Sequence, residues 1–504
     1  MTSGVMQRAE VERLKKELAV KLRLPKYPSD LELAQLVGRG EPLLRKKPVK
    51  TASGVAVVTV VAPLYTCPHG KCVYCPGGAA WGTPQSYTGE EAVVKNASSV
   101  NYDPKRQVQT SIEKYRRLGH PVDKVELIII GGTFTATSQT FQKSFIKNCL
   151  DALNGVPSNS LEEALVLAES SSIHVSGITV ETKPDWAKGE IVKNLVQMGV
   201  TKVEIGVQAL DNDILRLVNR GHSVEDVAEA TADLKDMSFK VCYHVMPNLP
   251  GSNPSKDLEM LLRIFDDERF RPDQLKIYPT LVLPGTELAE MWRRGEYKPY
   301  EEDELVSVLA EFMRRVPPYV RISRIQREIP LKTVLDGLRT PNLRQKVESL
   351  VGDGCRCIRC REHGHRKRPV NPNRAVCNRY VYRASGGLEY FISYDDPESD
   401  ALLGFIRLRI PPRTLTDELE GAALVRELHV YGQMKPVGTE PDETTSQHRG
   451  FGRLLMEEAE RVAFDEHGLD RVAVISGVGV RNYYRRLGYR LVGPYMCKDR
   501  GMSI

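Results

Sequence analysis

The 504-residue sequence lacks any apolar run long enough to cross a membrane. Its longest apolar stretch, residues 55–64, is interrupted by Thr59 and falls far short of the roughly 20 residues that a transmembrane helix needs. Residues 1–20 also lack the apolar core of a secretory signal and carry several basic side chains instead. We therefore expect a soluble, cytoplasmic protein with no membrane partner.

Internal repeats and low-complexity tracts are also absent. Hydrophobic residues make up 41% of the sequence and charged residues 27%, which is ordinary globular usage and excludes a disordered polyelectrolyte or a fibrous protein. At roughly 150 residues per domain, the length predicts two or three domains.

The net charge of +6 is concentrated in a few segments. Residues 1–50 contain 12 Lys and Arg against 6 Asp and Glu, and residues 355–383 contain nine Lys and Arg against Glu362 alone. Arg321, Arg324 and Arg327 form a smaller basic group. Such segments are either solvated faces or patches that bind the phosphates of a nucleic acid.

Six of the ten cysteines fall in two tight groups. Cys67, Cys72 and Cys75 have the spacing C-x4-C-x2-C. The second group, Cys355, Cys357 and Cys360, has the spacing C-x-C-x2-C, and Cys377 follows it. Disulfides are not expected in a long chain without a secretion signal, and thiolates this close on a loop converge on one centre. Both groups are therefore candidate metal sites.

From residue 54 to about 284, β-branched runs alternate with helical patterns. The runs predicted as strands are residues 55–61, 124–130, 178–181, 202–208, 240–246 and 274–279. Strict alternation of strand and helix predicts a parallel sheet with crossover helices, as an open sheet or a barrel.

Polar or glycine-rich residues follow five of these strands. The first cysteine group follows the first strand, Gly131-Gly132-Thr133 the second and residues 181–185 the third, while Gln208 ends the fourth and residues 246–251 follow the fifth. Because chemistry in such folds gathers at the carboxyl ends of the strands, these residues predict one site.

After about residue 344 the pattern changes. Residues 355–377 have too little apolar content to form a core unaided, so a metal would have to order them. Strands are then predicted at residues 380–384, 388–394, 402–410 and 425–431, followed by a helix at about 449–466, a strand at 472–475 and a short helix through 483–487. This order is typical of an α+β domain.

Three cysteines after the first strand of a partial (βα)6 barrel, with a Gly-Gly-Thr loop after the second, resemble the radical S-adenosylmethionine enzymes. The resemblance implies an α/β fold with a TIM-like radical SAM barrel and a 4Fe-4S cluster held by Cys67, Cys72 and Cys75. The fourth iron would stay open to chelate S-adenosylmethionine. Candidate contacts of that cofactor are Gly131, Gly132, Thr133 and Gln208. The alternative for three clustered cysteines is a zinc site.

Residues 447–452, with the sequence QHRGFG, resemble the pyrophosphate-binding turn of the GNAT acetyltransferases. Glycines let the backbone approach the anion, and the free N–H groups at a helix N-terminus bind it. Residues 427–430 and 482–484 stand where that fold keeps its thioester-binding strand and the tyrosine near the CoA sulfur. Of the adjacent tyrosines, we interpret Tyr483 as core packing and Tyr484 as the ligand contact.

The two lobes occur together in the family of the catalytic third subunit of the Elongator complex, which the sequence resembles over residues 50–504. The motifs that carry the resemblance are residues 65–69, 72–78, 85–89, 131–134, 427–432 and 479–484. The resemblance implies a tRNA-modifying acyltransferase that forms 5-carboxymethyluridine at the wobble uridine of the anticodon stem-loop. It would use acetyl-CoA, S-adenosylmethionine radical chemistry and an external electron donor.

The same resemblance maps the acetyl-CoA contacts to Lys124, Glu427, Leu428, His429, Val430, Phe451, Gly452, Arg453 and Tyr484. Lys124 and Tyr484 are the catalytic candidates among them. The second cysteine group suggests a stand-alone prokaryotic form in which Cys355, Cys357, Cys360 and Cys377 bind structural zinc, with His363 or His365 as substitutes for one cysteine.

We expect a basic tRNA-binding region at residues 1–50, a radical SAM domain at 51–345, a zinc-binding linker at 346–378 and a GNAT domain at 379–504. The sequence leaves the oligomeric state open, with a homodimer as one candidate. Two other functions stay open: a protein lysine acetyltransferase with a structural iron–sulfur domain, and a non-enzymatic RNA-binding subunit with two vestigial cofactor sites.

Overall fold

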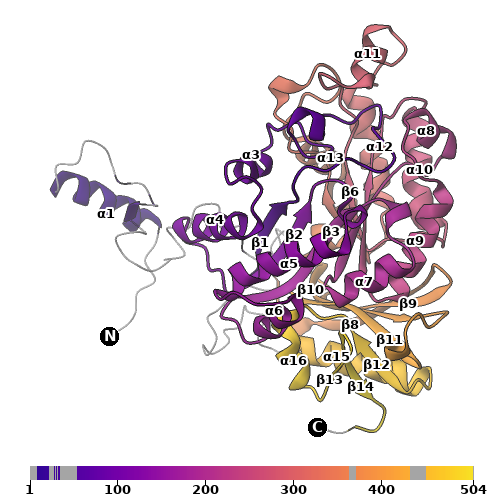
Figure 1. Cartoon of the computed structure of the whole chain (residues 1–504). Coiled ribbons are helices and arrows are strands. Elements are labelled where there is room, and N and C mark those ends of the chain that lie inside the picture. The colour runs from indigo at the N-terminus through magenta and orange to yellow at the C-terminus, as the bar shows by residue number, and fades with distance from the viewer. Residues whose placement is uncertain are drawn as a thin grey trace.

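The computed structural model describes residues 8–21, 28, 30, 32–33, 51, 54–362, 370–431 and 450–502. A parallel sheet wrapped by helices forms the upper part of the molecule, and a mixed sheet with two helices lies beneath it (Figure 1). Within the described ranges, no helix has both the length and the apolar character needed to span a bilayer.

Seven parallel strands in chain order build the upper sheet. They are β1 (Ala56–Val61), β2 (Lys124–Ile130), β3 (His174–Thr182), β4 (Lys202–Gln208), β5 (Lys240–Val245), β6 (Gln274–Ile277) and β7 (Arg321–Arg324). The predicted parallel αβ fold is confirmed, and β7 extends the six predicted strands. In the part of the chain that is described, no pairing joins β7 to β1, so the sheet is an incomplete barrel.

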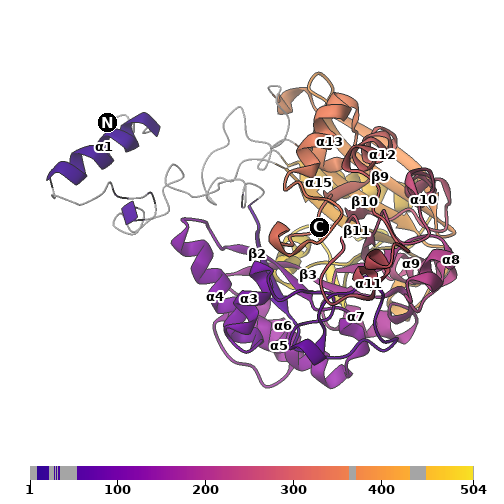
Figure 2. The ribbon, with the colours of Figure 1, turned by 90° about the horizontal axis from the view of Figure 1, so that it is seen from above.

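The helices α3 to α14 lie around this sheet, as the view from above shows (Figure 2). They are α3 (Ala92–Ser98), α4 (Pro104–Arg117), α5 (Gln139–Asn154), α6 (Leu161–Ala168), α7 (Glu190–Gln197), α8 (Asn212–Leu217), α9 (Val224–Asp236), α10 (Pro254–Asp266), α11 (Glu287–Arg293), α12 (Glu302–Arg315), α13 (Leu343–Val351) and α14 (Ile358–Arg361). Several begin at a capping side chain: Ser138, Ser160 and Asn253 each accept a backbone N–H of the first turn. A separate helix, α1 (Arg8–Lys21), stands apart from the barrel.

The two faces of the barrel strands differ in polarity. On β4, Val203, Ile205 and Val207 are fully buried in the apolar core, whereas the alternate residues Lys202 and Glu204 carry charge. Side chains alternate between the two faces of a strand, so the charged residues share the face opposite the apolar one. The barrel interior, which bulky apolar residues usually fill, is therefore charged.

The lower sheet has the order β13-β14-β12-β11-β10-β9-β8. Its strands are β8 (Val376–Ala384), β9 (Gly387–Asp396), β10 (Ala401–Ile410), β11 (Ala422–Val430), β12 (Arg471–Val474), β13 (Arg490–Val492) and β14 (Tyr495–Asp499), with helices α15 (Phe451–Arg461) and α16 (Arg481–Arg485). The predicted α+β domain is confirmed, with β13 and β14 as additional strands. Among the described strands of this sheet, β11 and β12 are the one parallel pair; their pairing ends at Val425 and Val474, so β11 continues toward Val430 paired only with β10.

A buried cluster of charges joins the two domains. The barrel contributes Lys235, Asp236 and Asp273, and the lower domain contributes Glu389, Arg409 and Arg426, all of them almost fully buried. Both guanidinium Nη atoms of Arg426 donate to Asp273 at 2.7 Å, and Arg409 Nε donates to Asp236 at 2.8 Å. Buried charges are tolerated only when they are paired in good geometry, so this cluster fixes how the domains meet.

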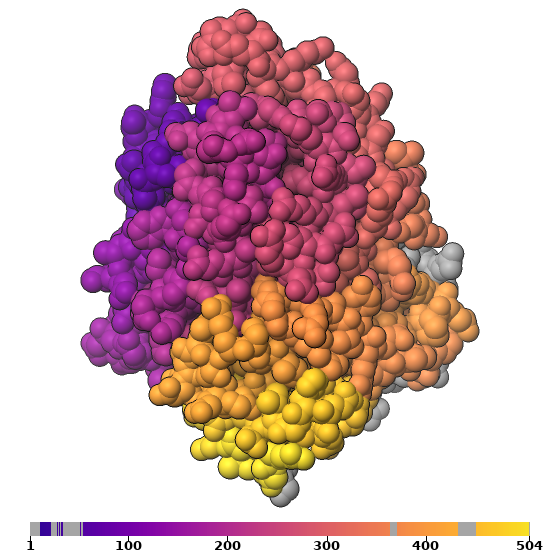
Figure 3. Space-filling view, turned by 90° about the vertical axis from the view of Figure 1, so that its right-hand side faces the viewer, coloured from indigo at the N-terminus to yellow at the C-terminus, as the bar shows by residue number. Residues whose placement is uncertain are grey.

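The lower domain covers the amino-terminal end of the barrel. Asp273 directly precedes β6, and Asp236 ends α9 shortly before β5 begins at Lys240. Gly479 lies against the first residues of β3, so close that a Cβ there would be 2.3 Å from the Val175 nitrogen. The space-filling view shows the two domains in continuous contact (Figure 3). The carboxyl end of the barrel, where the first cysteine group lies, therefore faces away from the lower domain.

Candidate functional site

The first cysteine group lies in the loop that leaves β1 at the carboxyl end of the barrel. Cys67, Cys72 and Cys75 are all buried. Each thiol meets a polar group: Cys67 Sγ lies 3.5 Å from Thr133 Oγ1, Cys72 Sγ lies 3.2 Å from His69 Nε2, and Gln85 Nε2 donates to Cys75 Sγ at 3.0 Å. Burial raises the pKa of the Cys67 thiol, although Thr133 and Arg220 oppose that rise.

The spacing of these thiols distinguishes a cluster from a single metal ion. Their sulfur atoms do not all lie within 4.8 Å of one another. Tetrahedral zinc, with Zn–S bonds of about 2.3 Å, would bring its sulfur ligands to about 3.8 Å from each other. A wider triangle of three thiolates fits a multi-iron cluster, so the donor set agrees with the predicted 4Fe-4S site.

The predicted S-adenosylmethionine contacts lie beside this loop. Gly131 and Gly132 have φ angles of +134° and +96°, and a Cβ on Gly132 would be 3.3 Å from the Gln85 side chain that bonds Cys75. Only glycine adopts such angles without strain, and it leaves the backbone open to a ligand. Gln208, at the end of β4, has a φ of +66° and a buried Oε1 without a hydrogen-bond partner among the described residues.

A buried arginine that the sequence interpretation missed faces the same cysteines. Arg220 donates to Gly206 O at 2.7 Å and directs Nη1 toward Cys72 Sγ at 3.8 Å. It follows α8 rather than a strand, so no strand-end signal marks it. Its positive charge favours bound thiolates at this site.

Several polar atoms around the loop are buried and have no hydrogen-bond partner within the part of the chain that the structure describes. They are Tyr65 Oη, His69 Nδ1, Tyr74 Oη, Asp185 Oδ1, Gln208 Oε1 and both ring nitrogens of His222. Burial, together with Lys183 and Arg220, lowers the pKa of His69 to about 4. Unsatisfied buried polar groups are costly, and their concentration at one end of the barrel is typical of a ligand site.

A chain of charged side chains fills the barrel interior and connects its two ends. Lys202 Nζ donates to Glu126 at 2.8 Å and lies 3.5 Å from Glu204, which also accepts from Lys276. Lys276 in turn lies 4.0 Å from Glu181. We refer to Glu126, Glu181, Lys202, Glu204, His244 and Lys276 as the lumen network.

The candidate acetyl-CoA residues lie where β11 runs beyond its partner β12. Glu427 is held by Arg407 Nε at 2.8 Å and lies 3.9 Å from Lys240 of the barrel. His429 stacks on Phe405, and burial lowers its pKa to about 4 although Glu427 opposes that shift. Leu428 packs with the apolar core of the lower domain.

The first turn of α15 offers the backbone of a pyrophosphate site. Gly450 precedes the helix with a φ of +78°, followed by Phe451, Gly452 and Arg453. A Cβ on Gly452 would be 2.7 Å from the Tyr483 hydroxyl and 3.7 Å from Val430. Residues 447–449 of the predicted turn lie outside the described residues.

The two adjacent tyrosines differ from their expected positions. Tyr484 is buried in the apolar core of the lower domain and packs edge-on against Tyr489. The Tyr483 hydroxyl instead lies beside Gly452 and has no partner among the described residues. The structure thus gives Tyr483, which we interpreted as core packing, the more direct approach to the helix turn.

Lys124 begins β2 at the end of the barrel that the lower domain covers. It pairs in register with His174, which Gly479 of the lower domain contacts. Its exposed side chain is therefore at the domain boundary, as expected for a barrel residue that reaches the acetyl-CoA domain.

The second cysteine group is compact. The Sγ atoms of Cys355, Cys357 and Cys360 lie within 4.8 Å of one another, a spacing that fits a single tetrahedral ion. The segment is anchored to the barrel, because Cys355, Cys357 and Ile358 join its core and Ile358 N donates to Val320 O at 2.8 Å. Residues 355–362 thus pack against β7, and the expectation that a metal orders this segment stays a prediction.

Cys377 does not join this group. It lies exposed on β8, opposite Tyr394 of β9, and its nearest charged neighbours are Glu458 and Arg379. Pairing with β9 fixes its position in the lower sheet, away from the other three thiols. The predicted four-cysteine set is therefore corrected to three, and His363 and His365 lie outside the described residues.

Arg321 is not an exposed phosphate contact either. Its guanidinium donates to Glu362 and, at 3.2 Å, to the Tyr431 hydroxyl. It therefore joins β7 to the end of the cysteine segment and to the residue that follows β11.

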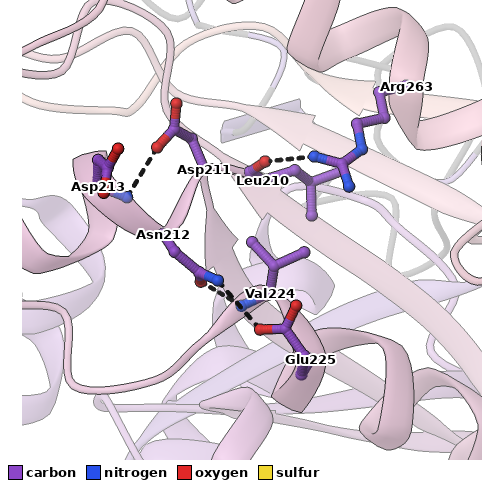
Figure 4. Close-up of a pocket in the computed structure, with 7 residues that line it drawn as sticks. All are labelled: Leu210, Asp211, Asn212, Asp213, Val224, Glu225 and Arg263. Atoms are coloured by element: carbon purple, nitrogen blue, oxygen red, sulfur yellow. Dashed lines mark hydrogen bonds between the residues drawn. The ribbon is translucent and has the colours of Figure 1, made fainter.

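A hollow between α8, α9 and α10 is separate from these sites (Figure 4). Asp211 caps α8, Asn212 bonds Glu225 and Val224, and Arg263 Nη1 donates to Leu210 O at 2.9 Å. Because these groups bond one another, the hollow is explained by the packing of the helices.

Three family models match the chain. The Radical SAM superfamily matches residues 61–264, the Radical SAM C-terminal domain matches 272–351 and the acetyltransferase (GNAT) family matches 366–489. The first implies a 4Fe-4S cluster with S-adenosylmethionine and the last implies acetyl-CoA, and the residues described above fit all three groups.

Relatives match most of this chain, across both of its domains. The tRNA uridine(34) acetyltransferase of Methanocaldococcus jannaschii is 46% identical over 489 residues, which cover 94% of this chain and 90% of that protein. Elongator complex protein 3 of Homo sapiens is 46% identical over 474 residues, covering 91% and 86%. The structure of the archaeal Methanocaldococcus infernus Elp3 with an N-terminal deletion matches with a TM-score of 0.79 and 42% identity, covering 89% of this chain and 100% of that one. The chain therefore belongs to the family that contains Elongator complex protein 3 and the tRNA uridine(34) acetyltransferases.

Proposed function

We propose that the protein modifies the wobble uridine of tRNA, forming 5-carboxymethyluridine with acetyl-CoA as the source of the added carbons. The observation that carries this proposal is the placement of two cofactor sites at opposite ends of one charged barrel. The cysteine loop lies at the carboxyl end, and β11 with Glu427 lies at the amino end, 3.9 Å from Lys240. A pair of unrelated activities would not need this connection.

The residues at the cysteine loop would bind the cluster and the nucleoside cofactor. When bound, these groups would supply a radical able to take a hydrogen atom from the acetyl methyl group. Cys67, Cys72 and Cys75 would hold the irons, Arg220 would balance thiolate charge, and the Gly131–Thr133 backbone with Gln208 would bind S-adenosylmethionine. The buried loop also keeps water away from the reacting groups.

In the lower domain, the amides at the start of α15 would bind the pyrophosphate of CoA. Tyr483, whose hydroxyl lies beside Gly452, would contact CoA directly, Tyr484 stays a candidate contact from the core behind it, and the β11 segment from Glu427 to Val430 would orient the thioester. Lys124, at the domain boundary, is a further contact. Arg453 is largely exposed and paired with Glu457, so its backbone rather than its charge serves the site.

We also propose structural zinc at Cys355, Cys357 and Cys360. These three thiols need one more ligand to close a tetrahedron, and His363 and His365 follow within a few residues. We keep the division at residues 50, 345 and 378 as the working domain boundaries, with residues 346–378 as the zinc-binding linker.

The basic segments are the proposed tRNA-binding surface. Deleting residues 1–45 should weaken tRNA binding and reduce its salt dependence, because fewer phosphates would be engaged. Acetyl-CoA binding should be unchanged, since no contact proposed above comes from that segment. If the deletion left the tRNA affinity unchanged, the tRNA-binding surface would have to lie elsewhere.

The reaction also needs an external electron donor. We propose the cytoplasm as the location of the protein, and we keep a homodimer as a candidate assembly.

The alternative function, protein lysine acetylation, needs an open peptide groove beside the CoA thioester. The end of β11 instead lies beside the barrel, where Glu427 is 3.9 Å from Lys240 and the half-buried His429 ring packs against Phe405 and Tyr431. This packing favours a substrate held against the barrel over a peptide in an open groove.

The test is anaerobic reconstitution with iron and sulfide, incubation with tRNA and both cofactors, and mass spectrometry of the nucleosides. We expect 5-carboxymethyluridine that depends on both S-adenosylmethionine and acetyl-CoA. Acetylated protein without any modified uridine would favour the alternative.

A further inference from the structure

The middle of the lumen network is organised by one carboxylate. Glu204 is only 1% exposed, and its Oε2 accepts from Lys276 while lying 2.9 Å from His244 Nε2. Its other oxygen lies 3.5 Å from Lys202. A single buried carboxylate thus has three nitrogen partners from β4, β5 and β6.

A metal ion is not the reason for this arrangement. Glu204, Cys242 and His244 lie close enough together to hold one. The ammonium groups of Lys202 and Lys276 already occupy the carboxylate, and two cations at that point would repel a divalent ion. The residues around Glu204 therefore form a set of paired charges, and a role other than metal binding has to explain their geometry.

The contacts of Lys276 lead toward the cysteine loop. Lys276 lies 4.0 Å from Glu181, whose other oxygen accepts from the Tyr87 hydroxyl at 3.4 Å. Tyr87 directly follows Ser86, which lies 3.5 Å from Cys75 Sγ. His244 packs edge-on against Tyr278, with 5.3 Å between the two ring centroids. Tyr278 lies two residues after Lys276 in the chain. Lys276 and His244, two of the three partners of Glu204, therefore lie toward the cluster end of the barrel.

Resting on the proposed function, we propose that Glu204 is a positioning residue that holds Lys276 and His244 toward the acyl carbonyl group being transferred to the uridine. The acetyl group has to meet the radical at the cluster end. When water later attacks the thioester carbon, the C–S bond breaks, CoA leaves as its thiol with a proton from that water, and a carboxylate remains once the second proton is released. Negative charge develops on the carbonyl oxygen during this attack, and prearranged donors stabilise such charge. Glu204 itself does not contact the substrate, and it acts through its two partners.

The first test is Glu204→Gln, which keeps the shape and removes the charge. We expect kcat for 5-carboxymethyluridine to fall about tenfold or more, because a charged hydrogen-bond acceptor is lost. The KM values for tRNA and acetyl-CoA should stay within about twofold, since uniform binding is not affected. Formation of 5′-deoxyadenosine should continue.

The matched control is Glu126→Gln. Glu126 is a second carboxylate of the same lumen and also pairs with Lys202, but it has no contact with Lys276 or His244. We expect this variant to keep near wild-type kcat. An equal loss in both variants would overturn the proposal, because the cause would then be an unpaired Lys202. Wild-type kcat in Glu204→Gln would overturn it as well.

The pH profile separates positioning from a loss of structure. Burial opposes the charge on Lys276, and Glu204 raises its pKa well above the usual value. Without Glu204, burial should dominate, so the kcat of Glu204→Gln should fall as the pH rises, while the wild type keeps its rate. The groups that face Lys276 and must be held constant are Lys202 of β4, Glu181 of β3, Cys242 and His244 of β5, Tyr278 of its own chain segment, and Arg324, its register partner on β7.

A combined variant covers the case in which Glu204→Gln folds poorly. Lys276→Gln combined with Glu204→Gln removes one charge of each sign, so the lumen stays balanced. If Glu204 acts through its two partners, adding Glu204→Gln to a variant that already carries Lys276→Gln and His244→Gln should not lower kcat further. A further drop of about tenfold would contradict that. If the wild-type protein formed no modified uridine, that result would reject the proposed function, and with it the role of Glu204 that rests on it.

Discussion

The two cysteine triads of this chain have similar spacing in the sequence and different surroundings in the structure. Cys67, Cys72 and Cys75 form a wide triangle beside Arg220, glycines with positive φ and several unpartnered polar atoms. Cys355, Cys357 and Cys360 form a compact group that packs into the barrel core beside β7. The first is built to leave room for a ligand, and the second is built to close around one ion.

The comparison teaches that the number of thiolates does not decide the chemistry of a site. Each triad supplies three sulfur ligands. What differs is the distance between the sulfurs and the polar groups that remain unsatisfied around them. A structural site needs a fourth ligand from the protein, whereas a catalytic site keeps one position open.

The largest expected effect comes from breaking the open triad. Cys72→Ala should abolish the iron–sulfur absorbance and the formation of 5′-deoxyadenosine, because three thiolates are the minimum set for the cluster. Acetyl-CoA binding by the lower domain should persist, since that domain contributes no ligand. The control is Cys149→Ala on α5, a buried isolated cysteine. Full cofactor cleavage in Cys72→Ala would remove the assignment.

Breaking the compact triad should affect stability more than chemistry. Cys360→Ser should lose zinc almost completely and lower the Tm by roughly 2–4 °C for each kcal/mol of folding free energy lost. Zinc analysis and thermal unfolding measure both effects. Acetyl-CoA binding should be largely retained. Iron at this position, or full zinc content in the variant, would show that the two triads have been exchanged in our interpretation.

A chelator sharpens the same comparison without a mutation. Under anaerobic conditions, a zinc chelator should remove the metal of the compact triad and leave the visible spectrum of the cluster in place. The rate of 5′-deoxyadenosine formation should fall only as far as the fold loosens. Parallel loss of zinc and cluster would mean that the sites depend on each other.

The smallest effect is expected at Cys377. Cys377→Ser should keep its zinc and its Tm within experimental error, because the thiol is exposed on β8 and separate from the triad. His363→Ala and His365→Ala, measured beside it, should identify the fourth ligand by zinc loss. Loss of zinc in Cys377→Ser alone would restore the four-cysteine set.

The sequence predicted the elements whose signals are local. β2 and β4 were predicted to the residue, because each is a β-branched run bounded by turns. β7, with the sequence RISR, and the three-residue β13 were not predicted, since a basic four-residue strand or a three-residue strand carries no apolar pattern. The five-residue β14, which ends in Lys498 and Asp499, was not predicted either. They exist because neighbouring strands offer hydrogen bonds.

The candidate site divides in the same way. Cys67, Gly131, Gln208 and the α15 turn follow strands or open a helix, so their positions could be inferred from the order of elements. Arg220 and the charged lumen could not, because their partners are distant in sequence: Arg220 faces Cys72 across 148 residues. Cys377 was misassigned for the reverse reason. It is near the other three cysteines in the sequence, but its pairing with β9 holds it in the lower sheet, away from them.

The central claim is that the cluster end and the acetyl-CoA end act on one acetyl group. The most direct measurement is anaerobic turnover with acetyl-CoA deuterated on the acetyl methyl group, followed by mass spectrometry of 5′-deoxyadenosine and of the tRNA nucleosides. We predict deuterium in 5′-deoxyadenosine together with 5-carboxymethyluridine that retains the remaining methyl deuterium. Modified uridine accompanied by 5′-deoxyadenosine without deuterium would contradict the account.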